Sequence, residues 1–155
     1  MVDPPLVRIS DLAGRPRGAG FVADDRGTVV TSHEAVDGLG HVVVHAPDGG
    51  TCLVSADGVV PLPGADLALV RTDGLDVAPL AVAALPPPEQ GAYVRIPAGG
   101  WREARVLGQT SVTYTATDGL HLLDHAVELA VGTAGADALR VGGGAAGGPV
   151  VDAAT

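Results

Sequence analysis

The chain has 155 residues, of which 46% are hydrophobic and 17% charged, and its formal net charge is −9 at pH 7. This size and apolar content favour one globular domain and exclude a disordered chain. The acidic balance, with arginine as the only basic side chain besides histidine, argues against nucleic acids and anionic membranes as partners, because both attract basic surfaces.

The N-terminal segment and the cysteine content bear on location. The segment "MVDPPLVRIS" lacks a basic stretch followed by an apolar one, and no run of about 18 apolar residues occurs, so we predict neither a secretory signal nor a membrane span. The single cysteine, Cys52, excludes an internal disulfide and is interpreted as a small strand hydrophobe. The excess of Ala, Gly, Val, Asp, Pro and Arg indicates a high-GC bacterial genome. We therefore expect a cytoplasmic bacterial protein.

Short apolar or alternating segments follow one another through the first half of the chain. They have the length of strands, are rich in β-branched residues, and are bounded by turn-forming groups such as "DDRG" and "PDGG". The expected strands cover residues 6–9, 20–23, 28–32, 41–46, 51–56 and 66–72. This spacing, with a turn about every 8–12 residues, favours an all-β sandwich or barrel.

Residues 76–90, "DVAPLAVAALPPPEQ", break this pattern. Three consecutive prolines can neither continue a helix nor donate to a sheet, so we interpret the segment as a connector. Strand-like segments resume at residues 92–96, 103–109, 111–117 and 126–132. The sequence therefore predicts two small β units, residues 1–75 and 91–155, joined by this connector.

The segment 119–131, "GLHLLDHAVELAV", fits either a helix face or a strand with period two, and the neighbouring strands favour a strand. On a helix, His121 and His125 would resemble a pair of metal ligands, but the glutamate of the HExxH pattern is missing. Two ordinary histidines are the better interpretation. On a strand, His41 and His45 would stand about 13 Å apart and could not chelate one ion unaided.

The glycine-rich run "GGGAAGG", residues 142–148, lacks the Lys-Ser/Thr ending of a phosphate-binding loop and follows no βαβ pattern. We predict no metal, nucleotide or other cofactor. The glycines instead permit unusual backbone angles and leave amide groups open to a ligand.

Three segments together resemble the trypsin-like serine proteases of bacterial type. Residues 18–38, "GAGFVADDRGTVVTSHEAVDG", are similar to the family's G-S/A-G-F strand and T-x-H-x-V motif. Residues 63–72, "PGADLALVRT", are similar to its D-L-A-L-L segment, and residues 142–151, "GGGAAGGPVV", resemble the G-x-S-G-G-P motif around the nucleophile. The order His, Asp, nucleophile is that of the chymotrypsin clan. The resemblance covers roughly residues 18–151.

The resemblance implies a trypsin-like double β-barrel with the catalytic groups in the cleft between the barrels. His33 would be the general base, Asp66 would orient its imidazole, and the amides of Gly144 and Ala146 would form the oxyanion hole. Taken alone, His33 also fits a structural histidine and Asp66 a turn residue. Position 146, where the family has its nucleophilic serine, is alanine in this chain.

An alanine methyl cannot attack a carbonyl, so the chain as written should not hydrolyse peptides through an acyl-enzyme. One interpretation is an engineered Ser-to-Ala form of an active serine endopeptidase. The other is a natural pseudoprotease that binds a peptide or protein in its cleft. Because His33, Asp66 and Gly144 are retained, the first is favoured, and the codon at position 146 of the source gene would separate the two.

Two further expectations rest on the resemblance. Arg140 corresponds to the base of the pocket for the residue preceding the cut, where a guanidinium would favour an acidic side chain; a surface arginine paired with Asp137 is the alternative. Several strands follow the G-x-S-G-G-P motif in the family, whereas nine residues follow Ala146 here. We therefore expect a second barrel truncated at its C-terminus, completed by a downstream segment of a larger protein or by a separate chain.

Overall fold

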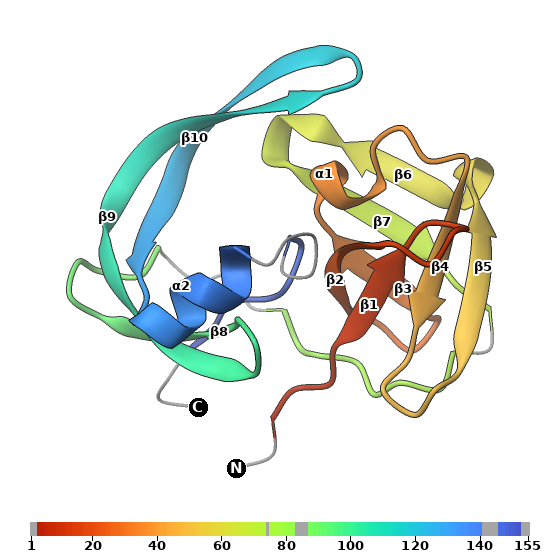
Figure 1. Ribbon diagram of the computed structural model, residues 1–155, viewed down its shortest axis with the longest axis horizontal. Coiled ribbons are helices and arrows are strands. Elements are labelled where there is room, and N and C mark those ends of the chain that lie inside the picture. The colour runs from red at the N-terminus through yellow and green to blue at the C-terminus, as the bar shows by residue number, and fades with distance from the viewer. Residues whose placement is uncertain (1–2, 74, 83–86, 141–145, 153–155) are drawn as a thin grey trace.

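The computed structural model describes residues 3–73, 75–82, 87–140 and 146–152, and about half of these residues lie in two antiparallel sheets (Figure 1). The all-β class is therefore confirmed. The first sheet has seven strands in the order β5-β4-β1-β2-β3-β7-β6. Its strands are β1 (Val7–Ser10), β2 (Pro16–Val22), β3 (Thr28–Thr31), β4 (His41–His45), β5 (Thr51–Ser55), β6 (Val59–Leu62) and β7 (Leu67–Arg71).

The period-two alternation of these strands places one face in a core. In β4, Val42 and Val44 are buried, whereas the residues between and beside them are more exposed. Val44 lies opposite Ile9 of β1, and both are completely buried. The remaining core residues are Val7, Val22, Val29, Val36, Val54, Ala68 and Val70. Burial of these apolar side chains provides the main stabilisation of the sheet.

Strand β6 was not predicted, because Pro61 within it argues against a strand. The structure places β6 at the edge of the sheet, paired only with β7, which is where strands tolerate proline. Two 3-10 turns flank it, η1 (Ala56–Gly58) and η2 (Pro63–Ala65), and a single-turn helix, α1 (His33–Val36), follows β3.

The second sheet has four strands in the order β10-β9-β8-β11. They are β8 (Tyr93–Pro97), β9 (Trp101–Ala116), β10 (Gly119–Ala130) and β11 (Val151–Asp152). Two runs that we expected to be separate strands, 103–109 and 111–117, form the single strand β9, which continues through Thr110 beside a register shift in β10. The strand expected over 119–131 is confirmed as β10. The small core of the second sheet consists of Val94, Ile96, Ala98, Ala104 and Val106.

The hairpin formed by β9 and β10 is the longest feature of the molecule. It arches from the second sheet over the first, and its turn lies above α1 and β6 (Figure 1). A helix not predicted from the sequence, α2 (Thr133–Arg140), follows β10. No helix in the described ranges is long and apolar enough to cross a membrane. Between Thr72 and Ala92, the described residues form no helix or strand, and the amide of Leu80 donates to the carbonyl of Val22.

Candidate active site

His33 stands at the point where strand β3 gives way to helix α1. Ser32 is the N-cap of this helix, and its hydroxyl accepts a hydrogen bond of 3.1 Å from the amide of Ala35. Such a cap satisfies an amide that has no partner within the helix. The short turn fixes the backbone of His33, which is buried with 7% of its surface exposed.

The Ala146–Gly147 turn lies against the same place. The carbonyl of Ala146 accepts a hydrogen bond of 2.8 Å from the amide of Ala19 in β2. Gly147 has φ +90°, and a Cβ on it would lie 2.6 Å from the amide nitrogen of Ser32 and collide with the hydroxyl of Thr31. Only glycine fits this backbone conformation in this space. Residue 146 is thereby brought from the far end of the chain to the residues that precede His33.

Gly18 is the counterpart of this turn on the first sheet. A Cβ on Gly18 would collide with the carbonyl oxygen of Ala146 and lie 2.8 Å from the Cβ of Ala35. Gly18 of "GAGF" and Gly147 of "AGGP" are therefore both required where the Ala146–Gly147 turn lies against the first sheet. The same contact thus explains why each of the two motifs contains a glycine at this position.

Asp66 directly follows the turn η2 and has a left-handed backbone conformation, with φ 48° and ψ 45°. Its Oδ1 accepts a hydrogen bond of 3.0 Å from the amide of Glu34. The carboxylate thus lies beside the first turn of α1, one residue along the chain from His33. Within the described residues, no hydrogen bond or ion pair joins Asp66 directly to His33.

The two ring nitrogens of His33 instead face groups that the sequence did not indicate. Nδ1 lies 3.0 Å from the hydroxyl of Tyr114 in β9, and Nε2 lies 3.8 Å from Oδ1 of Asp37. The Tyr114 hydroxyl also donates to the carbonyl of Pro63 over 2.7 Å. Burial, and then the nearby carboxylate of Asp66, raise the pKa of Tyr114. This phenol therefore stays neutral around His33 at neutral pH.

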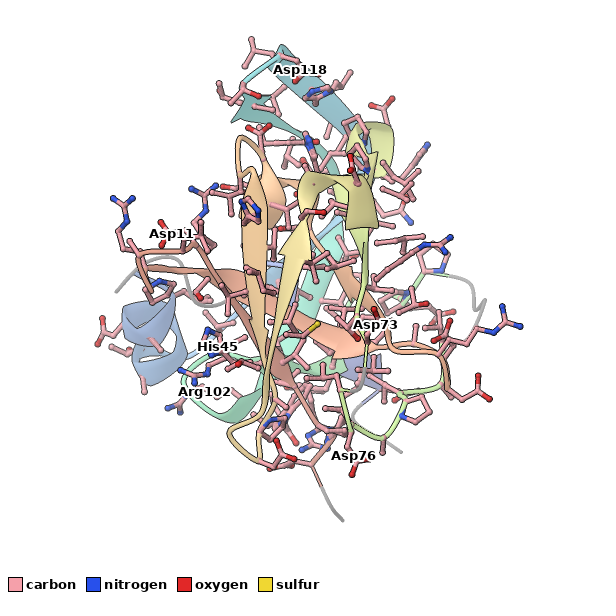
Figure 2. The ribbon with its side chains drawn as sticks, turned by 90° about the vertical axis from the view of Figure 1, so that its right-hand side faces the viewer. Asp11, His45, Asp73, Asp76, Arg102 and Asp118 are labelled. Carbon is pink, nitrogen blue, oxygen red and sulfur yellow. The ribbon has the colours of Figure 1, made fainter. Side chains whose placement is uncertain are left out.

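The turn of the β9–β10 hairpin is fixed above His33 by further contacts. The amide and hydroxyl of Thr117 donate to the two carboxylate oxygens of Asp37, over 2.7 and 2.8 Å. The ring of His121 stacks on that of Tyr114, with ring centroids 5.1 Å apart, and its Nε2 pairs with Asp118 at 2.7 Å. In Figure 2, Asp118 stands at the tip of the hairpin, above the first sheet.

The two remaining predicted site residues, and two of the histidines that the sequence analysis considered and set aside, are placed as follows. Gly144 lies outside the described residues, and Arg140 ends α2 with a side chain outside the described part. The hydroxyl of Ser10 pairs with Nε2 of His45 at 2.8 Å, and His125 lies at a register shift of β10 with φ 63°. Throughout the described ranges, no group of three His, Cys, Asp or Glu side chains is arranged to hold a metal ion.

Comparison with known proteins places this geometry in a family. The model of the trypsin-like peptidase domain matches residues 18–155. The chain belongs to the trypsin-like peptidase family. The resemblance of its three motifs and the trypsin-like β-barrel architecture are thereby confirmed.

Solved structures agree. The active form of the Rv3671c protease from M. tuberculosis is similar at 25% identity with a TM-score of 0.66, over 96% of this chain and 65% of that one. A serine-to-alanine mutant of it in an inactive form has 26% identity and a TM-score of 0.63, over 95% and 68%. The MamO protease domain from Magnetospirillum magneticum has 19% identity and a TM-score of 0.70, over 97% and 79%. The chain thus spans about two thirds of the length of the Rv3671c protease. The comparison with curated proteins found no match for this chain.

Proposed function

We propose that this chain is the proteolytic domain of a serine endopeptidase in which Ala146 occupies the position of the nucleophile. His33 is the general base, Asp66 orients it, and the amides of Gly144 and residue 146 receive the oxyanion. The substrate is a peptide or protein. The observation that carries the proposal is the docking of the Ala146–Gly147 turn on Ala19 and Ser32, directly beside His33.

A serine at position 146 would give this site a complete reaction. Its hydroxyl would add to the scissile carbonyl while its proton moves to Nε2 of His33, and the resulting imidazolium would return the proton to the departing amine. A carboxylate at Nδ1 stabilises the imidazolium formed in this step. The alanine of this chain has no proton to give and no nucleophilic atom, so the proposal predicts an inactive protein.

The experiment restores the hydroxyl with Ala146→Ser and follows cleavage of a mixed peptide library. Cleavage by this variant is expected to exceed that of the parent chain by about 10⁴-fold or more, the scale of the loss when a nucleophile is removed. Ala145→Ser is the matched control, because it adds the same hydroxyl one residue earlier. Adding His33→Ala to Ala146→Ser should abolish cleavage; cleavage that survives it would exclude His33 as the base.

A binding module is the second candidate function. It is supported by the alanine at position 146 together with the pairing of His33 with Tyr114 rather than Asp66. In that case Ala146→Ser gives no cleavage, and the parent chain captures the same peptides in a pull-down as the variant does. A serine codon in the source gene supports an engineered origin of Ala146, and an alanine codon a natural pseudoprotease.

Specificity and partners belong to the same proposal. Arg140 would select an acidic residue before the cut, and competition among substrates with Glu, Asp, Arg or Leu at that position tests it; preference for Leu or Arg would overturn it. The open edges of the described second sheet, β10 and β11, support completion by another segment or a separate chain. A location in the bacterial cytoplasm is proposed as well, and cell fractionation tests it.

A further inference from the structure

The hydrogen bonds around His33 define the protonation of its ring. The hydroxyl of Tyr114 gives its own proton to the carbonyl of Pro63. It can therefore only accept from Nδ1 of His33, so that Nδ1 carries a proton and, in the neutral ring, Nε2 holds the lone pair. Tyr114 consequently fixes the tautomer of His33, which is the task of the carboxylate in a catalytic triad.

Tyr114 takes this position next to the turn that carries Asp66. Its hydrogen-bond acceptor, Pro63, is the first residue of η2, and Asp66 directly follows that turn. The Asp66 carboxylate accepts a hydrogen bond from the amide of Glu34. The turn η2 thus has Asp66 directly after it and the Tyr114 hydroxyl bonded to its first residue, and in the described structure the neutral hydroxyl is the partner of Nδ1 of His33.

The hairpin of the second sheet holds Tyr114 next to His33, because the residues that follow Tyr114 are bonded to the end of helix α1. Two hydrogen bonds from Thr117 hold the turn to Asp37, which lies at the C-cap of α1. His121 adds stacking on Tyr114 and an edge-to-face contact with His33, with ring centroids 5.9 Å apart. The tip therefore contacts His33 and both ends of the helix that carries it.

We propose that Tyr114 is a positioning residue that competes with Asp66 for His33. The hairpin tip, residues 114–121, holds the imidazole in a resting arrangement, and His33 becomes an efficient base when the tip releases it to Asp66. The reason is charge: a carboxylate stabilises the imidazolium that forms when Nε2 takes a proton, and a neutral phenol does not. This inference rests on the proposed function for the role of His33.

The pairing itself can be tested in the chain as it stands, without activity. We would record the ring nitrogen and Nδ1-bound proton signals of ¹⁵N-histidine-labelled protein by NMR. Tyr114→Phe is expected to shift the His33 signals and to produce a strongly downfield Nδ1 proton that disappears in Tyr114→Phe/Asp66→Asn. Tyr93→Phe is the matched control, since this second tyrosine is 55% exposed on β8. Unchanged His33 signals in Tyr114→Phe would overturn the proposal.

The functional consequence is tested in the Ala146→Ser background with a serine-directed fluorophosphonate. Adding Tyr114→Phe should raise the labelling rate about fivefold, the factor that corresponds to one hydrogen bond. Thr117→Val, which removes one anchor of the tip, should raise it in the same direction, and Tyr93→Phe should not. A slower rate in Tyr114→Phe would overturn the competition, because Tyr114 would then assist the base.

The two proposals fail in different ways. If no Ala146→Ser variant is labelled, while Tyr114→Phe transfers the Nδ1 proton to Asp66 in the NMR spectra, the protease function fails and the competition for His33 stands. If Ala146→Ser is labelled equally with and without Tyr114, the protease function stands and the role of Tyr114 falls.

Discussion

The carbonyl oxygen of Ala146 accepts a hydrogen bond of 2.8 Å from the amide of Ala19, and the same oxygen fills the space that a side chain on Gly18 would need. We predict that Gly18→Ala destabilises the protein by about 1–3 kcal/mol, the cost of forcing extra volume into a packed site. Urea unfolding followed by circular dichroism measures this loss. Gly40→Ala is the control, because a Cβ there meets nothing within 4 Å. Equal effects of the two substitutions would contradict the argument.

Ser32→Ala removes the cap of α1. The amide of Ala35 then loses its side-chain acceptor, and we expect the free energy of unfolding to fall by about 1 kcal/mol. Ser55→Ala is the matched comparison, because Ser55 precedes η1 without a capping hydrogen bond from its side chain. Denaturant titration of both variants measures the difference, and a loss as large in Ser55→Ala would show that the cap is not its cause.

Asp24 is predicted to make stability depend on pH. Hydrogen bonds from the hydroxyl and amide of Thr28 hold the pKa of this carboxyl below its ordinary value of 3.8. Because the folded-state pKa is depressed, the stabilisation is present above pH 3.8 and is lost as the pH falls through the folded-state value. Thr28→Val, which removes the largest cause, should therefore destabilise the protein more at about pH 7 than at about pH 2.5.

Urea midpoints at the two pH values measure this effect. Asp25→Asn tests whether the neighbouring carboxylate causes the pH dependence instead, since Asp25 is the exposed neighbour of Asp24. A Thr28→Val defect of the same size at both pH values would show that packing, and not the carboxylate, explains the loss.

Ile9 lies in the core of the first sheet, where we predict that truncation of a side chain lowers the stability most. It is completely buried and lies opposite the completely buried Val44, so Ile9→Ala should cost about 2–5 kcal/mol. Leu53→Ala removes a comparable side chain from β5, where Leu53 is 61% exposed, and should cost less than about 0.5 kcal/mol. Thermal or chemical unfolding compares them, and similar losses would mean that burial does not set the cost.

Local sequence signals predicted most of the fold, because strands with one buried face alternate visibly, as in β4 and β7. They missed β6, where Pro61 masks an edge strand, and they divided β9 at Thr110. In both places the pairing partner decides the structure: β7 accepts a strand that contains proline, and β10 shifts its register beside the pair of Thr110 and Ala126. Such partners are distant in the chain, so a local pattern does not contain them.

The sequence predicted those residues of the candidate site that lie within a recognisable motif. His33 and residue 146 belong to motifs in which a glycine, Gly18 or Gly147, is required by a close backbone approach, whereas Gly64 in the motif of Asp66 meets no such neighbour. Tyr114 and Thr117 were missed because their partners lie 81 and 80 residues away in the sequence. The only available signal was a tyrosine among threonines in "SVTYTAT", which marks a polar strand without naming its partner.

The length of β9 has a consequence for the order in which the chain folds. The strand has 16 residues, which corresponds to a length of about 50 Å. Its first half packs in the core of the second sheet, and Tyr114 near its end contacts His33 at the start of α1. A contact between residues far apart in the sequence requires the chain between them to lose conformational entropy before the contact stabilises the fold. We therefore expect each sheet to form by its own hairpins first. The contact of Tyr114 with His33 then forms in a slower late phase, and this centre is the last region of the nascent protein to take shape.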